Sequence, residues 1–93
     1  MVIEHDKQSK KGAFYIQEDG KRLAELQYFI SSPGKMTIFH TEVNAEFRGE
    51  NIGEDLVAAA VEFARENELK IIPTCSYAKK VIDETPEYRD VLA

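Results

Sequence analysis

A short glycine-containing loop separates strand-like segments from the longest helical pattern in the sequence. The loop covers residues 44–53 and reads Asn-Ala-Glu-Phe-Arg-Gly-Glu-Asn-Ile-Gly. Segments before it alternate apolar and polar residues, which is typical of half-buried strands. The segment after it repeats apolar residues at helical spacing. The chain is therefore expected to fold as strands first and then to continue through one long helix.

The helix is expected to cover residues 52–67. Its apolar residues recur at spacings of three and four, so that they form one stripe, and Glu62, Arg65 and Glu66 face outward. Asn51 followed by Glu54 three positions later is a capping-box pattern, which predicts the start of the helix. The apolar stripe consists of Ile52, Leu56, Ala59, Ala60 and Phe63.

Four strand-like segments precede the loop. Residues 2–5 form a possible short edge strand, and residues 6–12 are expected to be a solvated loop. Asp19-Gly20 is a strong hairpin signal between strands at 13–17 and 23–30. Residues 31–35 contain Ser, Pro and Gly and predict a further turn before a strand at 36–43. Three consecutive antiparallel strands joined by such turns form a meander.

The segment after the helix completes the expected fold. Residues 69–75 are apolar and form a strand, and a helix of about 16 residues before it fits a crossover to a parallel neighbour. A short helix at 76–83 and a last turn at 88–92 are expected to follow. The predicted class is α+β, with a mixed, mostly antiparallel sheet made of a meander plus one β-α-β crossover.

The loop chemistry allows two interpretations. The first N–H groups of a helix have no internal partner and carry the positive end of the helix dipole, so they attract phosphate oxygens. Gly49 and Gly53 allow close approach of a ligand, and Arg48 can add a charge-assisted contact. Alternatively the loop is an ordinary helix entry, since Glu54 and Asp55 already place negative charge there.

Composition excludes several classes of protein. Ninety-three residues predict one domain over 1–93, and 43% hydrophobic with 31% charged residues is ordinary for a soluble protein. A net charge of −5 argues against a nucleic-acid binder, and no apolar run is long enough to span a membrane. One cysteine and two histidines offer no disulfide and no metal-ligand spacing. We expect a cytoplasmic protein that needs no metal.

The loop and its flanking segments resemble those of a known family. Residues 48–53 look like the (Gln/Arg)-x-x-Gly-x-(Gly/Ala) signature of the GNAT superfamily, the acetyl-CoA-dependent N-acetyltransferases. Arg48 and Gly53 match its first and last positions, and Asn51 replaces the middle glycine. Residues 40–43 (His-Thr-Glu-Val) and 71–77 (Ile-Ile-Pro-Thr-Cys-Ser-Tyr) extend the resemblance to the small single-domain branch. It implies a minimal acyl-CoA N-acyltransferase fold and acetyl-CoA as cosubstrate.

The same resemblance implies roles for individual residues. The loop amides would bind the pyrophosphate of coenzyme A, and backbone N–H groups near Val43 would polarise the thioester. His40 and Cys75 would lie close to the thioester, with His40 as base and Cys75 as nucleophile or polar wall. Glu42 could orient His40 or replace it, and Tyr77 could protonate the leaving thiolate. The implied loop contacts are Val43, Arg48, Gly49, Glu50, Asn51, Ile52 and Gly53.

Structural explanations remain open for the same residues. A cysteine at the end of an apolar strand is often simply buried, and a histidine sharing a strand face with Ile38 is often a core residue. Tyr77 could pack through its ring alone. The sequence by itself does not decide between these explanations and catalytic roles.

Larger relatives carry helices between their first two strands, and this chain has only a loop there. One side of the cleft should therefore be open, which suits an exposed lysine or N-terminus of a protein better than a small metabolite as the amine acceptor. Three functions remain: an N-acetyltransferase, a CoA-binding module with little turnover, and a small interaction domain. A monomer or a weak homodimer is expected.

Overall fold

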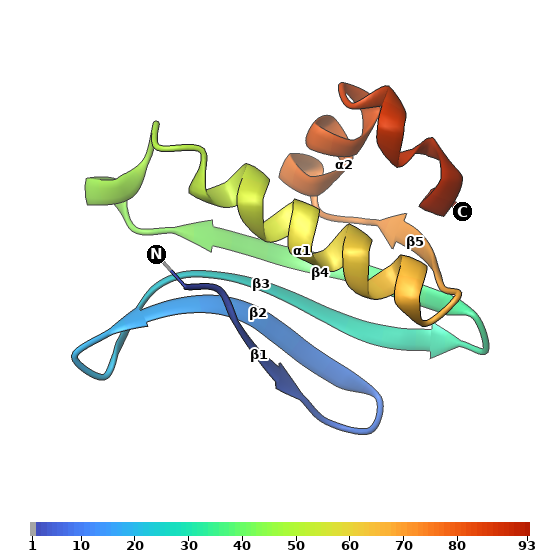
Figure 1. Cartoon of the computed structure of the whole chain (residues 1–93), viewed down its shortest axis with the longest axis horizontal. Coiled ribbons are helices and arrows are strands. Elements are labelled where there is room, and N and C mark those ends of the chain that lie inside the picture. The colour runs from blue at the N-terminus through green and yellow to red at the C-terminus, as the bar shows by residue number, and fades with distance from the viewer. Residues whose placement is uncertain (1) are drawn as a thin grey trace.

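The computed structural model describes residues 2–93, which form a five-stranded sheet with helices packed on it (Figure 1). The α+β class and the mixed sheet are confirmed. In chain order the elements are β1 (Glu4–Lys7), β2 (Lys11–Glu18), β3 (Lys21–Ser32), β4 (Lys35–Val43), the 3-10 helix η1 (Ala45–Phe47), α1 (Ile52–Glu66), β5 (Lys70–Pro73), α2 (Ser76–Asp83) and the 3-10 helix η2 (Pro86–Val91).

The strands lie in sequence order across the sheet. Pairs β1–β2, β2–β3 and β3–β4 are antiparallel, and β4–β5 is parallel, so the meander and the single crossover through α1 are confirmed. Asp19 and Gly20 form the two-residue hairpin loop, with φ values of 51° and 78°. Positive φ at both positions matches the twist of the flanking strands, which explains the Asp-Gly signal.

The expected loop at residues 6–12 is wrong in its extent. Strand β1 continues to Lys7, and β2 begins at Lys11, so only residues 8–10 connect them. The polar side chains misled the prediction, because every residue of β1 is exposed at the sheet edge. Gly12 permits this close pairing, since a Cβ there would lie 2.5 Å from the Tyr28 hydroxyl and 2.7 Å from the Asp6 carbonyl oxygen.

Helix α1 lies across one face of the sheet (Figure 1) and supplies six of the eighteen buried residues that form the core among residues 2–93. It begins at Ile52 as expected, but the predicted capping box is wrong. Asn51 makes no side-chain cap and instead has φ 60° and ψ 19°, a left-handed conformation that Asn tolerates better than most residues. The buried face is also broader than the predicted stripe: it includes Val57, Val61 and Ala64, whereas Ala59 and Phe63 are only half-buried.

The core lies between α1 and the sheet and is closed by α2. Its fully buried large side chains come from β3, β4, β5 and both helices, and they are Tyr28, Leu26, Met36, Ile38, Leu56, Ile71, Ile82, Val57 and Val61. None of the helices formed by residues 2–93 is both long and apolar enough to cross a membrane.

Candidate functional site

Strands β4 and β5 separate before β4 ends. Their parallel register runs from Lys35–Lys70 to Ile38–Pro73. The amides of Thr74 and Cys75 then both donate to the Ile38 carbonyl, at 3.0 and 3.2 Å, and the chain turns into α2. The rest of β4, from residue 39 to 43, continues without a β5 partner, so a gap opens between it and α2.

A β-bulge at Phe39 decides which side chains face this gap. Ile38 pairs with Tyr28, but His40 pairs with Gln27, so β4 contains one residue more than β3 over this stretch. Because a bulge shifts the alternation of side chains, Thr41 lies opposite buried Leu26 and faces α1. His40 faces the opposite side, which corrects the expectation that it shares a strand face with Ile38.

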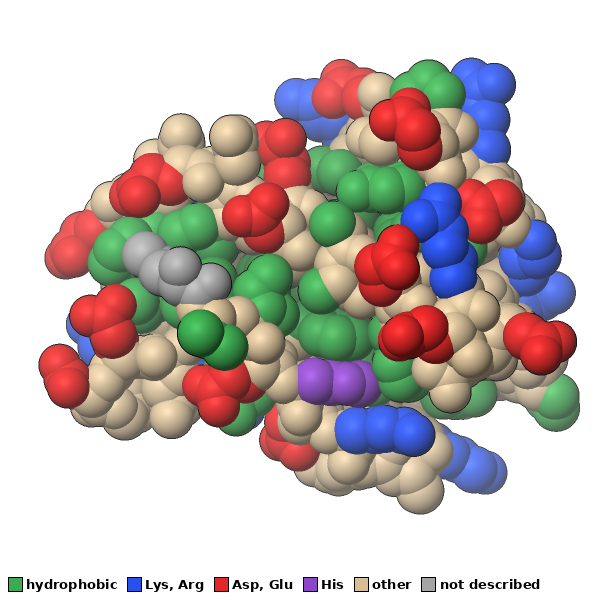
Figure 2. Space-filling model, viewed as in Figure 1, with side chains coloured by type: hydrophobic (Ala, Val, Ile, Leu, Met, Phe, Trp, Pro, Cys, Tyr) green, Lys and Arg blue, Asp and Glu red, His purple; other side chains and the backbone are tan. Residues whose placement is uncertain are grey.

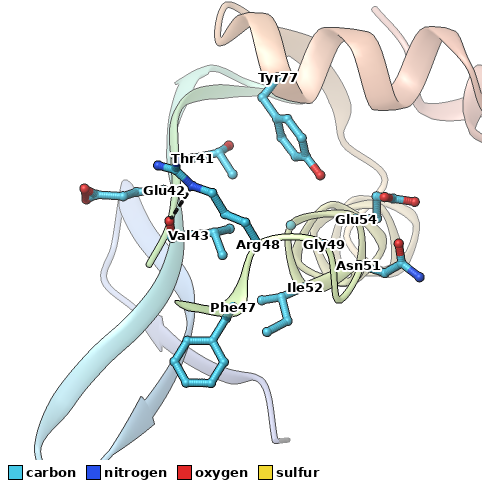
Figure 3. Close-up of a pocket in the computed structure, with 11 residues that line it drawn as sticks. Thr41, Glu42, Val43, Phe47, Arg48, Gly49, Asn51, Ile52, Glu54 and Tyr77 are labelled. Atoms are coloured by element: carbon cyan, nitrogen blue, oxygen red, sulfur yellow. Dashed lines mark hydrogen bonds between the residues drawn. The ribbon is translucent and has the colours of Figure 1, made fainter. Parts of the chain in front are cut away.

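A pocket of about 490 Å³ lies between the end of β4, the loop after it, the start of α1 and α2 (Figure 3). Figure 3 shows Thr41 and Val43 pointing toward it, Glu42 pointing away, and the Tyr77 ring hanging over it from α2. The lining residues are Thr41, Glu42, Val43, Phe47, Arg48, Gly49, Asn51, Ile52, Gly53, Glu54 and Tyr77.

The loop and the first turn of α1 offer free backbone donors to this pocket. The first helical hydrogen bond runs from the Asp55 amide to the Asn51 carbonyl, at 3.0 Å. Within residues 2–93, the N–H groups from 49 to 54 donate to no backbone carbonyl. Gly49 has φ 90° and nothing within 4 Å of where a Cβ would stand. This stretch therefore has the geometry of an anion-binding cradle.

The electrostatics of this segment are mixed. Glu42, Glu46, Glu50 and the Glu54–Asp55 pair surround a single cation, Arg48, in residues 42–55. Acidic side chains gather over the loop between β4 and α1 on the surface (Figure 2). Arg48 Nε donates to the Val43 carbonyl at 3.3 Å, so its guanidinium lies along the strand end rather than over the loop.

Gly53 has a role that the sequence did not indicate. A Cβ at this position would lie 2.6 Å from the Tyr77 hydroxyl oxygen and 2.9 Å from its ring. The glycine therefore makes room for the Tyr77 ring at the start of α1. Burial raises the pKa of the Tyr77 phenol, and the nearby carboxylates of Glu54 and Asp55 raise it further. The phenol is consequently protonated at neutral pH and able to donate.

Cys75 precedes α2 and reaches the pocket side of β4. It is half-buried, and its thiol donates to the Thr41 hydroxyl at 3.5 Å. Burial raises the pKa of the thiol, but Thr41 and the amides of Ala78 and Tyr77 outweigh it, so that the pKa is lowered overall. Sequence reasoning missed Thr41, since only the bulge turns it toward Cys75.

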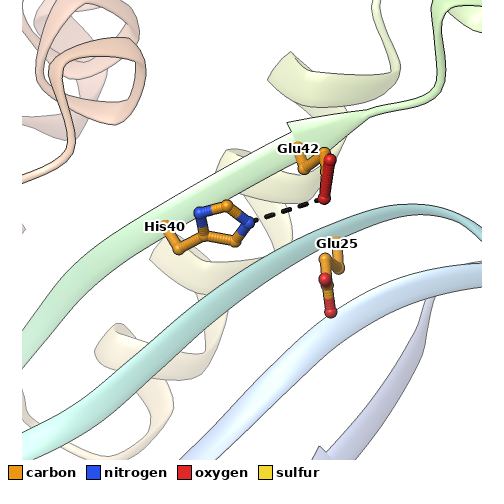
Figure 4. A group of neighbouring side chains, drawn as sticks. All are labelled: Glu25, His40 and Glu42. Carbon is orange, nitrogen blue, oxygen red and sulfur yellow. Dashed lines mark ion pairs between the residues drawn. The ribbon is translucent and has the colours of Figure 1, made fainter.

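His40 and Glu42 lie together on the face of β4 turned away from α1 (Figure 4). His40 Nε2 lies 3.7 Å from Glu42 Oε2, and Glu25 stands directly opposite Glu42 on β3. The structure thus places Cys75 and Tyr77 on one side of β4 and His40 on the other. On the His40 side, Glu25, His40 and Glu42 offer ligand atoms within 4.8 Å of one another, but Glu25 is already paired with Arg22 at 2.9 Å, and we assign no ion there.

Comparison with known sequences gives consistent matches. The GCN5-related N-acetyl-transferase family pattern matches residues 13–91. Protein NATD1 of Danio rerio is 36% identical over 85 residues, covering 90% of this chain and 76% of NATD1. Protein NATD1 of Homo sapiens is 33% identical over 85 residues, covering 90% of this chain and 74% of NATD1.

Solved structures share the fold. A GCN5-like protein from Staphylococcus aureus, solved by NMR, is 38% identical, with a TM-score of 0.77, and the match covers 97% of this chain and 87% of that one. The ribosomal-protein-S18-alanine N-acetyltransferase from Escherichia coli is 12% identical, with a TM-score of 0.68 over 84% of this chain and 53% of that one. At that identity the second match shows the fold alone.

Proposed function

The chain belongs to the GCN5-related N-acetyltransferase family, and from this membership and the pocket we propose that it transfers the acetyl group of acetyl-CoA to an amine. One observation carries the proposal. The pocket is bounded by the loop and helix start whose N–H groups, from residue 49 to 54, have no backbone acceptor within residues 2–93. Such donors fit a pyrophosphate.

The loop residues contribute mainly through their backbone in this proposal. Gly49, Glu50, Asn51, Ile52 and Gly53 present N–H groups to the pyrophosphate, and the left-handed conformation of Asn51 replaces the glycine of the family signature. Glu54 and Asp55 in the first turn of α1 repel a pyrophosphate. The hydrogen bonds from the loop amides therefore have to outweigh this repulsion.

Two residues at the strand end have separate tasks in the proposal. Arg48 turns from the Val43 carbonyl toward a phosphate, where its forked guanidinium makes charge-assisted hydrogen bonds. The backbone near Val43, beside the gap between β4 and α2, receives the thioester carbonyl and stabilises negative charge on its oxygen.

Acetyl transfer requires one bond to form and one to break. The neutral amine nitrogen attacks the thioester carbon, the carbon–sulfur bond breaks, and the amine proton passes to a base. The products are an amide and CoA, whose thiolate is protonated by Tyr77. The raised pKa of Tyr77 keeps its phenol protonated for this purpose. Hydroxyl donors of this kind typically act as general acids in active sites.

His40 is the proposed base, and Glu42 orients it or takes its place. Both lie on the face of β4 opposite Thr41, so the amine approaches from that face and the thioester from the α1 face. The gap between β4 and α2 is where the two reactants meet. This arrangement favours direct transfer over an acetyl-cysteine intermediate on Cys75.

An exposed lysine or N-terminus of a protein is the proposed acceptor. Only residues 8–10 connect β1 to β2, so nothing in this connection encloses a small acceptor. A binding module with little turnover is the second candidate. It is favoured by the position of His40, which does not share a face with Cys75 or Tyr77.

Release of CoA from acetyl-CoA, measured with a panel of amines, tests the proposal. Amine-dependent CoA release supports an acetyltransferase, whereas binding without release supports the second candidate. His40→Gln should lower turnover by about 10²-fold, because a positioned base typically contributes at least this much. Its affinity for acetyl-CoA should stay close to that of the wild type.

Cys75→Ala distinguishes the two routes. Direct transfer should survive this substitution, since no bond forms to the sulfur. Exposed Glu66→Gln on α1 serves as a matched surface control and should leave turnover unchanged. An acetyl adduct on Cys75, detected by mass spectrometry and discharged by an amine, would contradict direct transfer.

A further inference from the structure

Thr41 is the side chain of β4 that links this strand to the start of α2. Its Oγ1 lies 3.5 Å from Cys75 Sγ, and both residues are half-buried; Thr41 lines the pocket, and Cys75 is not among the lining residues. The last bonded pair of β4 and β5 is Ile38–Pro73. The contact between Thr41 and Cys75 therefore spans the two segments after they have separated.

The backbone of Cys75 is held firmly, and its sulfur has the Thr41 hydroxyl as side-chain partner besides the backbone amides of Tyr77, Ala78 and Thr41. Its amide donates to the Ile38 carbonyl at 3.2 Å, and its carbonyl accepts from the Lys79 amide at 3.0 Å. These two bonds fix the main chain at the end of β5 and the start of α2. The orientation of the sulfur then depends on the groups that it contacts, among which Thr41 supplies the side-chain partner.

A hydroxyl can serve both protonation states of a thiol. The neutral thiol donates its hydrogen to Thr41 Oγ1, and a thiolate accepts the hydroxyl hydrogen instead. Hydrogen bonds to a charged acceptor are stronger than those between neutral groups. The contact with Thr41 should therefore favour the thiolate over the thiol.

We propose that Thr41 is a positioning residue, which orients the Cys75 sulfur toward the side of β4 that lines the pocket and stabilises its thiolate. The lowered pKa of Cys75 agrees with this role: burial raises it, and the hydrogen bond from Thr41 heads the groups that lower it. This role of Thr41 does not depend on the route of acetyl transfer, because direct transfer forms no bond to the Cys75 sulfur. The effect of Thr41 on the Cys75 thiolate can be measured without coenzyme A.

The pH dependence of Cys75 alkylation by iodoacetamide tests this proposal in the protein alone. Cys75 is the only cysteine in the sequence, so the reaction reports on one sulfur. In Thr41→Val, which keeps the shape and removes the hydroxyl, alkylation near neutral pH should be about threefold to tenfold slower. Above the pKa of the thiol it should be at least as fast as in the wild type, because a thiolate of higher pKa is more nucleophilic.

Two further variants distinguish a hydrogen bond from a change in packing. Thr41→Ser restores the hydroxyl and should bring the titration back toward the wild type. Thr37→Val on the same strand is the matched control. The Thr37 hydroxyl donates to Ser31 Oγ at 2.9 Å and not to Cys75, so removal of this hydroxyl should leave the Cys75 titration unchanged. Should Thr41→Val fail to fold, Thr41→Ala carries the same expectation.

A titration of Cys75 that is the same with and without the Thr41 hydroxyl would overturn the proposal. So would faster alkylation of Thr41→Val at every pH, since this would mean that Thr41 only shields the sulfur. Neither result depends on acetyl-CoA. A wild-type protein that releases no CoA with any amine would count against the proposed function and leave the role of Thr41 intact.

Discussion

His5 joins the edge strand β1 to the aromatic side chains on the α1 side of the sheet. Its ring stacks on Phe14 with centroids 4.0 Å apart and lies edge-on to Phe63 at 4.8 Å. The Tyr28 hydroxyl and His5 Nε2 lie 2.6 Å apart and share a hydrogen bond. These contacts give His5 a structural role at the edge of the sheet.

Stability should therefore depend on the protonation of His5. Although His5 is exposed overall, partial desolvation of its ring lowers its pKa below 6.5, Lys7 lowers it further, and Asp6 opposes them. Between the folded pKa and 6.5 the unfolded chain binds more protons than the folded one, so the free energy of unfolding should fall as pH falls through this window. Urea unfolding measured between about pH 5 and pH 8 checks this slope.

His5→Gln is the variant that isolates this effect. It removes the titrating group, so the free energy of unfolding should change less with pH in the variant than in the wild type over the same window. The variant should also be less stable at the upper end, because it loses the stacking on Phe14. Identical slopes for the two proteins would show that His5 does not carry the pH dependence.

Some single residues could be predicted from sequence and others could not. The tolerance of Asn51 for left-handed backbone follows from its chemistry, and the structure shows φ 60° there. The position of Thr41 against Cys75 does not follow from either residue. It depends on a bulge that lies two residues away in β4 and on the register with β3.

At the level of elements, β4 shows where sequence patterns stop being informative. Residues 36–43 read as one strand, and the structure has a strand from Lys35 to Val43. The alternation does not reveal the bulge, because a bulge depends on the partner strand and has no strong composition of its own. A regular strand would have placed His40 on the face of Ile38, so the error in the site came from one residue of register.

Helix α1 was predicted well because its amphipathic pattern is long. Leu56 lies in its centre and is fully buried against the sheet. Leu56→Ala should lower the free energy of unfolding by about 2–5 kcal/mol, since the surrounding core collapses only partly into the space left behind. That is a large part of the total of about 5–15 kcal/mol expected for a protein domain.

Chemical denaturation of the variants tests this prediction. Glu66→Ala on the exposed side of the same helix is the control and should change stability by no more than about 0.5 kcal/mol. A loss in Leu56→Ala as small as that of the control would mean that α1 does not anchor the core.

The C-terminal segment is fastened to α1 by side chains that are distant in sequence. Arg65 contacts both carboxylate oxygens of Asp90, at 3.0 and 2.9 Å, and the Glu87 carbonyl at 2.7 Å. The hydrogen bonds to Asp90 raise the pKa of Arg65 and lower that of Asp90. The sequence predicted a last turn here but gave no sign of its partner, because the pairing links residues 25 positions apart.

On the scale of the whole molecule, the two faces of the sheet carry different functional groups at the C-terminal end of β4. The α1 face carries the pocket with the loop amides, Thr41 and Tyr77, and Cys75 contacts Thr41 on this side. The opposite face carries His40 beside Glu42. The arrangement separates the proposed sites of acyl donor and amine, with the gap between β4 and α2 as the place where they meet.

The charge distribution distinguishes the same region. In residues 42–55 five acidic side chains accompany one arginine, and the whole chain has a net charge of −5. The segment that supplies most of the pocket lining is therefore acidic, and acidic side chains also show on the surface over the loop between β4 and α1 (Figure 2). This should weaken binding of a polyphosphate and favour the approach of a cationic amine.

Mapping of acetyl-CoA binding by NMR tests the central claim most directly. Titration of the ¹⁵N-labelled protein with acetyl-CoA should change the amide resonances most in residues 43–54 and in Tyr77, because this segment and Tyr77 supply most of the pocket lining. Changes should be small in β1, which lies at the far edge of the sheet. No change at millimolar acetyl-CoA, or changes confined to parts of the chain outside the pocket, would contradict the assignment of this pocket to the acyl donor.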